Sequence, residues 1–146
     1  MIEKEKIDIL HICTPHYLLV PMAIYAAKHN INVFMEKPPA VSREQFLQLK
    51  SVKDQVQIGV CFQNRYNKSV QYIREILQNG KAGKIIGARA FITWNRGEKY
   101  YTQSGWRGNF KTEGGGLLIN QAIHTLDLLI YFLGNPLAVE GNIIKH

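Results

Sequence analysis

The sequence predicts an α/β protein built on a parallel sheet. In the first half of the chain, apolar segments of five or six residues alternate with helical patterns of about twelve residues, which is typical of βαβ units. The length of 146 residues suits one domain, or one and a half, and the 46% apolar and 20% charged residues are those of a globular protein. These values exclude disordered, collagen-like and low-complexity classes. The longest nearly apolar run, residues 17–27, is too short to span a bilayer, so we expect no membrane partner.

The first half contains three strand and three helix patterns. Pro21 falls inside the first helical pattern, and we expect it in the first turn, where a proline removes no hydrogen bond. Ser42 and Gln45 form a capping box at the start of the second helix, and Asn79-Gly80 is a typical end for the third. Right-handed crossovers are expected to place helices on both faces of the sheet. In chain order, the expected strands and helices are 7–12, 18–29, 31–35, 42–54, 56–60 and 68–78.

The pattern changes in the second half. Residues 88–94 alternate and are rich in aromatic and β-branched side chains, which predicts a strand of another sheet. The triple glycine 114–116 leads into an apolar-striped helix over 117–133, and a last strand is expected over 138–144. The chain begins inside an α/β pattern and ends just after a new sheet begins. We therefore expect it to be the middle of a larger protein.

The net charge of +7 is concentrated in one segment. Residues 62–111 contain ten basic and two acidic side chains. This surplus indicates either an anionic partner, such as phosphate groups, a nucleotide or nucleic acid, or a solvated basic face. Cys13 and Cys61 each end an apolar run without a C-x-x-C pair, so we expect buried, reduced thiols, which favours a cytoplasmic location.

Polar side chains follow each of the three expected strands. The loops 13–16, 36–39 and 61–65 contain a hydroxyl, several basic groups, a carboxylate, an amide and a guanidinium. In open parallel sheets, ligands bind beyond the carboxyl ends of the strands. Strand-end loops are also polar for structural reasons alone, so both interpretations stay open at this point.

The helix over 117–133 carries a second candidate set. Asn120, His124 and Asp127 have i, i+4, i+7 spacing and would share one face beside the apolar stripe. Partial desolvation favours a neutral histidine, which suits a general base that Asp127 could orient. A polar helix edge facing water is the alternative. No third ligand has a convincing spacing, so we expect no metal, and the chain contains neither G-x-G-x-x-G nor a Walker motif.

Two motifs in combination are specific. Glu36-Lys37-Pro38 follows a strand, and about eighty residues later a triple glycine leads to a helical His124-x-x-Asp127. With segments 12–16, 21–23, 64–65 and 106–108, they resemble the glucose–fructose oxidoreductase, inositol dehydrogenase and MocA (Gfo/Idh/MocA) family over nearly the whole chain.

The resemblance implies the fold and the function. Family members are oxidoreductases, mostly of sugars and cyclic polyols, that use NAD or NADP. They pair a Rossmann domain, a doubly wound parallel sheet, with an α+β domain built on an open, largely antiparallel sheet. This chain resembles the second half of the first domain, over 1–84, and the start of the substrate and oligomerisation domain, over 85–146. We therefore expect part of a dehydrogenase acting on a secondary hydroxyl of a sugar, cyclic polyol or sugar derivative, and a homo-oligomer formed through the open sheet. Without the glycine loop, the chain alone is expected to bind a dinucleotide poorly.

The resemblance also implies residue roles. Lys37 would polarise the substrate hydroxyl and His124 would be the acid–base residue. Asn120, the third catalytic and substrate-binding residue, stands where many members carry aspartate and can position a hydroxyl but cannot act as a base. The Lys37–Pro38 peptide bond is expected to be cis. The cofactor-binding residues would be Thr14, Pro15, His16, Glu36, Lys37, Pro38, Arg65, Trp106 and Arg107.

Two non-catalytic alternatives remain. The first is a truncated module that dimerises through its open sheet and does no chemistry. The second, less favoured, is a nucleic-acid-binding module, because segment 84–111 interleaves six basic residues with six aromatic ones that could hold phosphates and stack bases.

Overall fold

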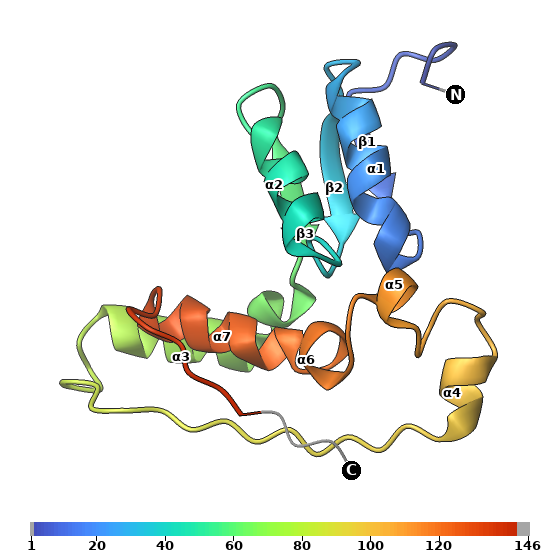
Figure 1. Ribbon diagram of the computed structural model, residues 1–146. Helices are drawn as coiled ribbons and strands as arrows, with labels where there is room; N and C mark the ends of the chain where they lie inside the picture. The colour runs from blue at the N-terminus through green and yellow to red at the C-terminus, as the bar shows by residue number, and fades with distance from the viewer. Residues whose placement is uncertain (1, 143–146) are drawn as a thin grey trace. The chain divides into compact units, whose positions relative to one another are not determined.

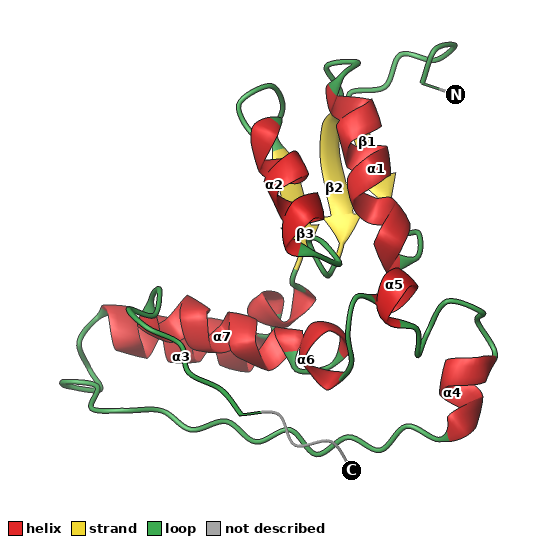
Figure 2. Cartoon of the chain, viewed as in Figure 1, coloured by secondary structure: helices red, strands yellow, loops and turns green. Residues whose placement is uncertain are grey.

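The computed structural model describes residues 2–142, and within them forms one parallel sheet of three strands in the order β1-β2-β3 (Figures 1 and 2). The strands are β1 (Ile9–Ile12), β2 (Asn32–Glu36) and β3 (Ile58–Cys61), which confirms the three predicted strands. Ile12 pairs with Met35, and Glu36 pairs with Cys61. The carboxyl ends of the strands are therefore level, and the polar loops that follow them begin at one edge of the sheet.

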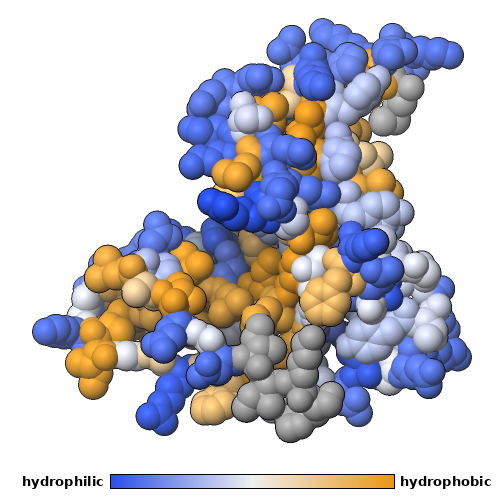
Figure 3. Space-filling view, viewed as in Figure 1, coloured by the Kyte–Doolittle hydropathy of each residue, from blue (hydrophilic) through white to orange (hydrophobic). Residues whose placement is uncertain are grey.

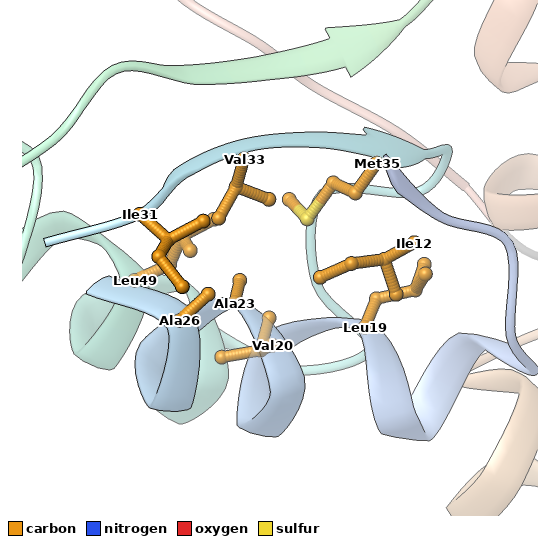
Figure 4. Close-up of a cluster of buried hydrophobic side chains, with 9 residues drawn as sticks. All are labelled: Ile12, Leu19, Val20, Ala23, Ala26, Ile31, Val33, Met35 and Leu49. Carbon is orange, nitrogen blue, oxygen red and sulfur yellow. The ribbon is translucent and has the colours of Figure 1, made fainter. Parts of the chain in front are cut away.

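The helices α1 (His16–Ala27) and α2 (Arg43–Ser51) both pack on one face of this sheet. On that face Val33 and Met35 are almost fully buried, whereas Phe34, which points to the opposite face, is 40% exposed. Of the predicted helices on both faces, the two that belong to this unit, α1 and α2, lie on the same face. Right-handed crossovers that always advance in the same direction keep every helix on one side, and only a reversal of strand order moves a helix to the other. The core formed in this way consists of Ile12, Leu19, Val20, Ala23, Ala26, Ile31, Val33, Met35 and Leu49 (Figure 4).

Pro21 lies inside α1 as the sixth residue of the helix, not in its first turn as predicted. A proline at this position supplies no N–H for the carbonyl four residues earlier, which belongs to Tyr17. The side chain of Gln45, on α2, donates from Nε2 to that Tyr17 oxygen at 3.3 Å. A side chain from the neighbouring helix thus replaces the hydrogen bond that the proline removes.

The predicted helix start at Ser42 is confirmed. The Ser42 hydroxyl accepts a hydrogen bond from the Gln45 amide at 3.2 Å, which satisfies one of the unpaired N–H groups at the start of α2. The Gln45 side-chain oxygen accepts from the amide of Val41 at 3.3 Å, one residue before the cap. Gln45 therefore connects the start of α2 both to the preceding loop and to α1.

The described residues divide into two compact units, which we describe separately. The first contains the residues up to Phe62 together with Phe91–Ile123, and the second contains Gln63–Ala90 and the described residues from His124. The predicted domain boundary at 84/85 stays a prediction. The remaining helices are η1 (Gln63–Tyr66), α3 (Lys68–Gln78), α4 (Glu98–Thr102), α5 (Phe110–Glu113), α6 (Leu117–Asn120) and α7 (Ile123–Leu133).

The predicted helix over 117–133 is two helices. After α6 the chain makes a wider turn, in which the amide of Ala122 donates to the carbonyl of Leu117, five residues earlier, at 2.8 Å. The later part of the predicted stripe, Leu126, Ile130 and Leu133, lies on α7 and is 43–45% exposed. Figure 3 shows apolar side chains gathered over this part of the chain.

Two predicted strands are not formed by the described residues. Residues 88–94 pair with no neighbouring strand in the part of the chain described, and a strand without a partner leaves its backbone N–H and C=O groups to water. Residues 138–142 likewise have no strand partner there, and the predicted residues 143 and 144 lie outside the described range. The predicted second sheet is therefore not seen within residues 2–142.

The prediction of buried thiols was wrong for Cys13, which is exposed, and Cys61 is only half-buried. Cys13 follows the buried Ile12, and successive side chains of a strand point to opposite faces. Among residues 2–142, no single helix is long and apolar enough to cross a membrane; one bent pair, α5–α6 with α7, meets that test by length and composition alone.

Gly114 lets the backbone at the end of α5 lie closer to Val41 and Ile119 than any residue with a Cβ atom would allow. It ends α5 with a φ of +90°, and its amide donates to the Phe110 carbonyl at 3.0 Å. A Cβ atom there would lie 2.6 Å from the Cβ of Val41 and 2.9 Å from the Cδ1 of Ile119. The first glycine of the triplet therefore has a packing role, and its N–H is already used.

We expect Gly114→Ala to lower the free energy of unfolding by about 2–5 kcal/mol, because it combines a left-handed backbone with overpacking against Val41. Chemical denaturation of the chain measures this loss. Gly97→Ala is the matched control: Gly97 has a φ of −65°, and a Cβ atom added to it would meet no atom within 4 Å, so its substitution should change stability by less than about 1 kcal/mol. Equal losses in the two variants would contradict the packing role.

Candidate functional site

Lys37 connects the end of β2 to α6 in the first unit. The Lys37–Pro38 peptide bond is cis, as the resemblance implied. The Lys37 ammonium donates to the backbone oxygen of Asn120 at 2.9 Å and to its side-chain Oδ1 at 3.1 Å. These two residues are 83 positions apart in sequence. An ammonium has three N–H donors, so one remains without an acceptor among the described residues.

The Asn120 side chain is held in one orientation. Asn120 is 7% exposed, and its Nδ2 donates to the Tyr100 hydroxyl at 3.2 Å and to the Glu113 carboxylate. Lysine can only donate hydrogen bonds and an ionised carboxylate can only accept them. The amide oxygen must therefore face Lys37 and the amide nitrogen must face Glu113.

Glu113 organises this part of the site, although it is only 2% exposed. One carboxylate oxygen accepts from Asn120, and the other accepts from the backbone amide of Gly108 at 2.7 Å. Its backbone carbonyl accepts a hydrogen bond from Nδ1 of His16 at 2.9 Å. The sequence analysis missed Glu113 and the role of Tyr100. The available signal was an acidic residue directly before the triple glycine.

Burial and neighbouring charges alter the titration of two groups here. The pKa of Lys37 is lowered, first by burial and also by the positive charge of Arg107, while Glu36 and Glu113 oppose the shift. The pKa of His16 is also lowered, mainly by burial, with a smaller contribution from Lys37. His16 is therefore neutral at physiological pH and can donate from Nδ1 to the Glu113 carbonyl.

Aromatic rings surround the Lys37–Asn120–Glu113 cluster. The His16 ring is buried and meets the Trp106 ring edge-on, with 4.7 Å between the ring centroids. The Arg107 guanidinium lies 4.5 Å from the centre of the Tyr100 ring and 5.0 Å from that of Trp106. Of the predicted site residues, the structure thus brings together His16, Lys37, Trp106, Arg107 and Asn120.

The other predicted cofactor residues of the first unit lie at the strand ends. Thr14 and Pro15 follow β1, and Glu36 ends β2, the neighbouring strand. The Thr14 hydroxyl contacts the Met22 sulfur at 3.5 Å, and one Glu36 oxygen accepts from the Lys37 amide at 3.3 Å. Their roles in cofactor binding stay predictions.

In the second unit, Arg65 forms an ion pair with Asp127. Its Nε and Nη2 donate to the two carboxylate oxygens at 2.7 and 2.5 Å, and Asp127 is 8% exposed. This two-point pairing assigns the Asp127 carboxylate to Arg65, and it joins η1 to α7. His124 also lies on α7, whereas Asn120 lies on α6. The prediction of one continuous face for Asn120, His124 and Asp127 was therefore wrong.

No group of three or more His, Cys, Asp or Glu side chains within residues 2–142 is arranged to hold a metal ion. Hydrogen-bonding groups that could bind an organic ligand are concentrated in the Lys37–Asn120–Glu113 cluster. It has a partly buried ammonium with one N–H to spare, a fixed amide and neighbouring aromatic rings, of which His16 and Trp106 meet edge-on.

Both parts of the chain match models of known protein families. Residues 1–62 match the model described as the oxidoreductase family, NAD-binding Rossmann fold. Residues 70–146 match the model described as the GFO/IDH/MocA C-terminal domain.

Individual relatives agree with these matches. The D-glucoside 3-dehydrogenase of Escherichia coli (strain K12) is 32% identical over 97% of this chain and 40% of its own length. The 2,7-anhydro-N-acetylneuraminate hydratase of the same strain is 32% identical over 92% of this chain and 36% of its own length. The crystal structure of the WlbA dehydrogenase from Bordetella pertussis, in complex with NADH and UDP-GlcNAcA, matches with a TM-score of 0.81 and 30% identity, over 92% of this chain and 39% of that one. The chain thus spans 36–40% of the length of these relatives.

We expect Glu113→Gln to lower the pKa of Lys37 further, because the Glu113 carboxylate is one of the two charges that raise it. An NMR titration of the Lys37 side-chain signals in the purified chain measures the change. Glu98→Gln is the control, because Glu98 is an exposed glutamate on α4 and is not among the groups that shift Lys37. An unchanged or raised Lys37 pKa in Glu113→Gln would show that this carboxylate does not tune the ammonium.

Proposed function

Because this chain belongs to the GFO/IDH/MocA family of NAD-dependent oxidoreductases, we propose that it forms part of a dehydrogenase active site that oxidises a secondary hydroxyl of a sugar, cyclic polyol or sugar derivative. The observation that carries the proposal is the pair of hydrogen bonds from the Lys37 ammonium to Asn120. They hold a partly buried cation just beyond the carboxyl end of β2, which is where ligands of open parallel sheets bind.

The Lys37 ammonium suits the stabilisation of an alkoxide. When hydride leaves the carbon of a secondary alcohol, its hydroxyl proton must also leave, and negative charge develops on the oxygen. The third N–H of Lys37 is available to that oxygen, and a positive charge in a partly desolvated site acts on it strongly. Because the two hydrogen bonds to Asn120 already fix the ammonium, it needs little reorganisation when the charge appears.

Asn120 cannot accept the hydroxyl proton, because its oxygen is a neutral amide acceptor. We assign that step to His124, which stands four residues later at the start of α7, because imidazole is the side chain best suited to exchange a proton near neutral pH. The assignment rests on the His124-x-x-Asp127 motif that follows the triple glycine. In the reverse direction, the protonated imidazole would return the proton to the carbonyl oxygen.

The residues present fit one end of a dinucleotide. Thr14 and Pro15 follow β1 and Glu36-Lys37-Pro38 follow β2, so polar groups and an ammonium with one N–H to spare stand at the ends of adjacent strands. These residues would border the nicotinamide, and NAD, when bound, would take the hydride from the substrate carbon. No glycine-rich dinucleotide loop occurs in this sequence, so no residue of the chain is assigned to the pyrophosphate.

A homo-oligomer is a second proposal. The open second sheet through which it was expected is not formed within residues 2–142, so we place the contact instead on the face of the parallel sheet that α1 and α2 leave uncovered. On that face Phe34 is 40% exposed, and Ile9 at the start of β1 is 62% exposed. We expect two copies of the chain to bury these side chains against each other.

In the enzyme that contains this chain, we expect Lys37→Ala and His124→Ala each to lower turnover at least about a hundredfold, because alkoxide stabilisation and proton transfer are each worth that much. NADH absorbance during oxidation of a panel of sugars and polyols measures the rates. Lys50→Ala and His29→Ala, which change exposed residues of α2 and of the segment after α1, are the controls. Near-normal turnover in both Lys37→Ala and His124→Ala would overturn the proposal.

For the second proposal, we expect light scattering after size exclusion to give twice the monomer mass for the wild-type chain, and the monomer mass for Phe34→Glu. A buried carboxylate without a partner opposes association. A wild-type monomer at every concentration tested would contradict the oligomer.

A further inference from the structure

Two guanidinium groups lie against the Tyr100 ring of the first unit. The Cζ atom of Arg107 is 4.5 Å from the ring centre, and that of Arg96 is 4.9 Å from it. The Tyr100 hydroxyl accepts from Nδ2 of Asn120, whose Oδ1 accepts from Lys37. Three cationic side chains are thus connected to one another through Tyr100 and Asn120.

Neither arginine forms an ion pair with a carboxylate within the described residues. A cation–π contact with a ring occupies no carboxylate, so the N–H donors of the guanidinium that point away from the ring stay available for bidentate bonds to an anion. The Nε atom of Arg107 is buried and has no acceptor there. Leaving a buried donor without a partner is unfavourable, so an acceptor supplied by a ligand would be favoured.

The positive charges around Lys37 also favour an anionic ligand. The positive charge of Arg107 lowers the pKa of both Lys37 and His16, so like charges repel one another in this site. Glu36 and Glu113 already offset part of this repulsion, and an anionic group beside Arg107 would reduce it further. The structure also accounts for part of the basic surplus of segment 62–111, since Arg96 and Arg107 both belong to it.

Space for such a group exists beside Arg96. An open hollow of about 400 Å³ is lined by Thr93, Trp94, Asn95 and Arg96. The Arg96 guanidinium also lies 5.1 Å from the centre of the Trp94 ring, which lines the same hollow. A ring and a cation side by side suit a planar, charged substituent.

We propose that the substrate of this site is a sugar or polyol that carries a carboxylate or phosphate group, bound by Arg107 and Arg96 while Lys37 and Asn120 hold the reacting hydroxyl. This inference rests on the proposed function, because it assigns the substrate class of the same site. The phosphates of the cofactor have the same anionic chemistry, and the experiment must separate the two sources.

The test follows the side-chain Nε–H signals of the arginines by NMR in the 146-residue chain, during titration with three probes. The probes are glucuronate, its neutral counterpart glucose, and NADH. We expect glucuronate to shift the signals of Arg107 and Arg96 and to bind at least about tenfold more tightly than glucose, as a charge-assisted bidentate pair allows. Arg107→Gln should remove that preference.

Two further variants keep the test independent of folding. Arg96 is exposed, so Arg96→Gln should leave the fold intact and still reduce the preference for glucuronate. Arg74 is the matched control, because its guanidinium also stacks on a tyrosine, 3.9 Å from the Tyr131 ring, but belongs to the second unit. Arg74→Gln should leave glucuronate binding unchanged.

The outcomes separate the two proposals. Equal binding of glucose and glucuronate, unaffected by Arg107→Gln, would overturn the anionic substrate and leave the sugar dehydrogenase standing. Arginine signals that shift with NADH but not with glucuronate would also overturn it and assign the guanidinium groups to the cofactor phosphates. Binding of NADH alone, with neither sugar bound and no arginine signal shifted, would count against both proposals.

Discussion

The hydrogen bonds between the Lys37 ammonium and Asn120 are the interaction on which the candidate site depends. They join the end of a parallel strand to a short helix 83 residues later. The ammonium can be held there because Asn120 offers two oxygen acceptors while its own nitrogen is occupied by Glu113 and Tyr100. Each polar atom in this chain of contacts therefore has a defined direction, and the remaining N–H of Lys37 is the group left for a ligand.

Glu113 makes this arrangement electrostatically possible. A nearly buried carboxylate would be costly alone, but here it accepts hydrogen bonds from an amide side chain and a backbone N–H and offsets the charge of Lys37. Its carbonyl also receives the His16 hydrogen bond, which fixes the first turn of α1. Gly114, the next residue, is pressed against Val41, so the glycine positions α5 and with it the carboxylate. The packing of Gly114 against Val41 therefore helps to position the charge of Glu113, the residue before it.

The sheet provides the frame and leaves one face open. Because β1, β2 and β3 advance in one direction, both crossover helices cover the same side, and Phe34 on the other side stays partly exposed. The helix packing tolerates Pro21 because Gln45 supplies the hydrogen bond that the proline cannot. Residues 88–94, and residues 138–142 of the strand predicted over 138–144, have no strand partner among the described residues. A strand is stable only when another strand pairs with it, so neither segment forms one there.

Local patterns in the sequence were sufficient for the three strands of the parallel sheet, the Ser42 cap and the end of α3, because periodicity and capping residues act over a few positions. The Glu36-Lys37-Pro38 motif, together with the triple glycine and His124-x-x-Asp127, was sufficient for the family. The family resemblance also predicted Lys37, Asn120, Trp106 and Arg107 as site residues, and the structure brings them together, while their roles stay predictions. Only the tertiary structure could bring in Glu113 and Tyr100, pair Arg65 with Asp127, divide the helix after Asn120 and place Gln45 against Tyr17. Each of these depends on contacts between distant segments, and hydrogen-bond partners at such separations are decided by packing, which leaves no signal in local periodicity.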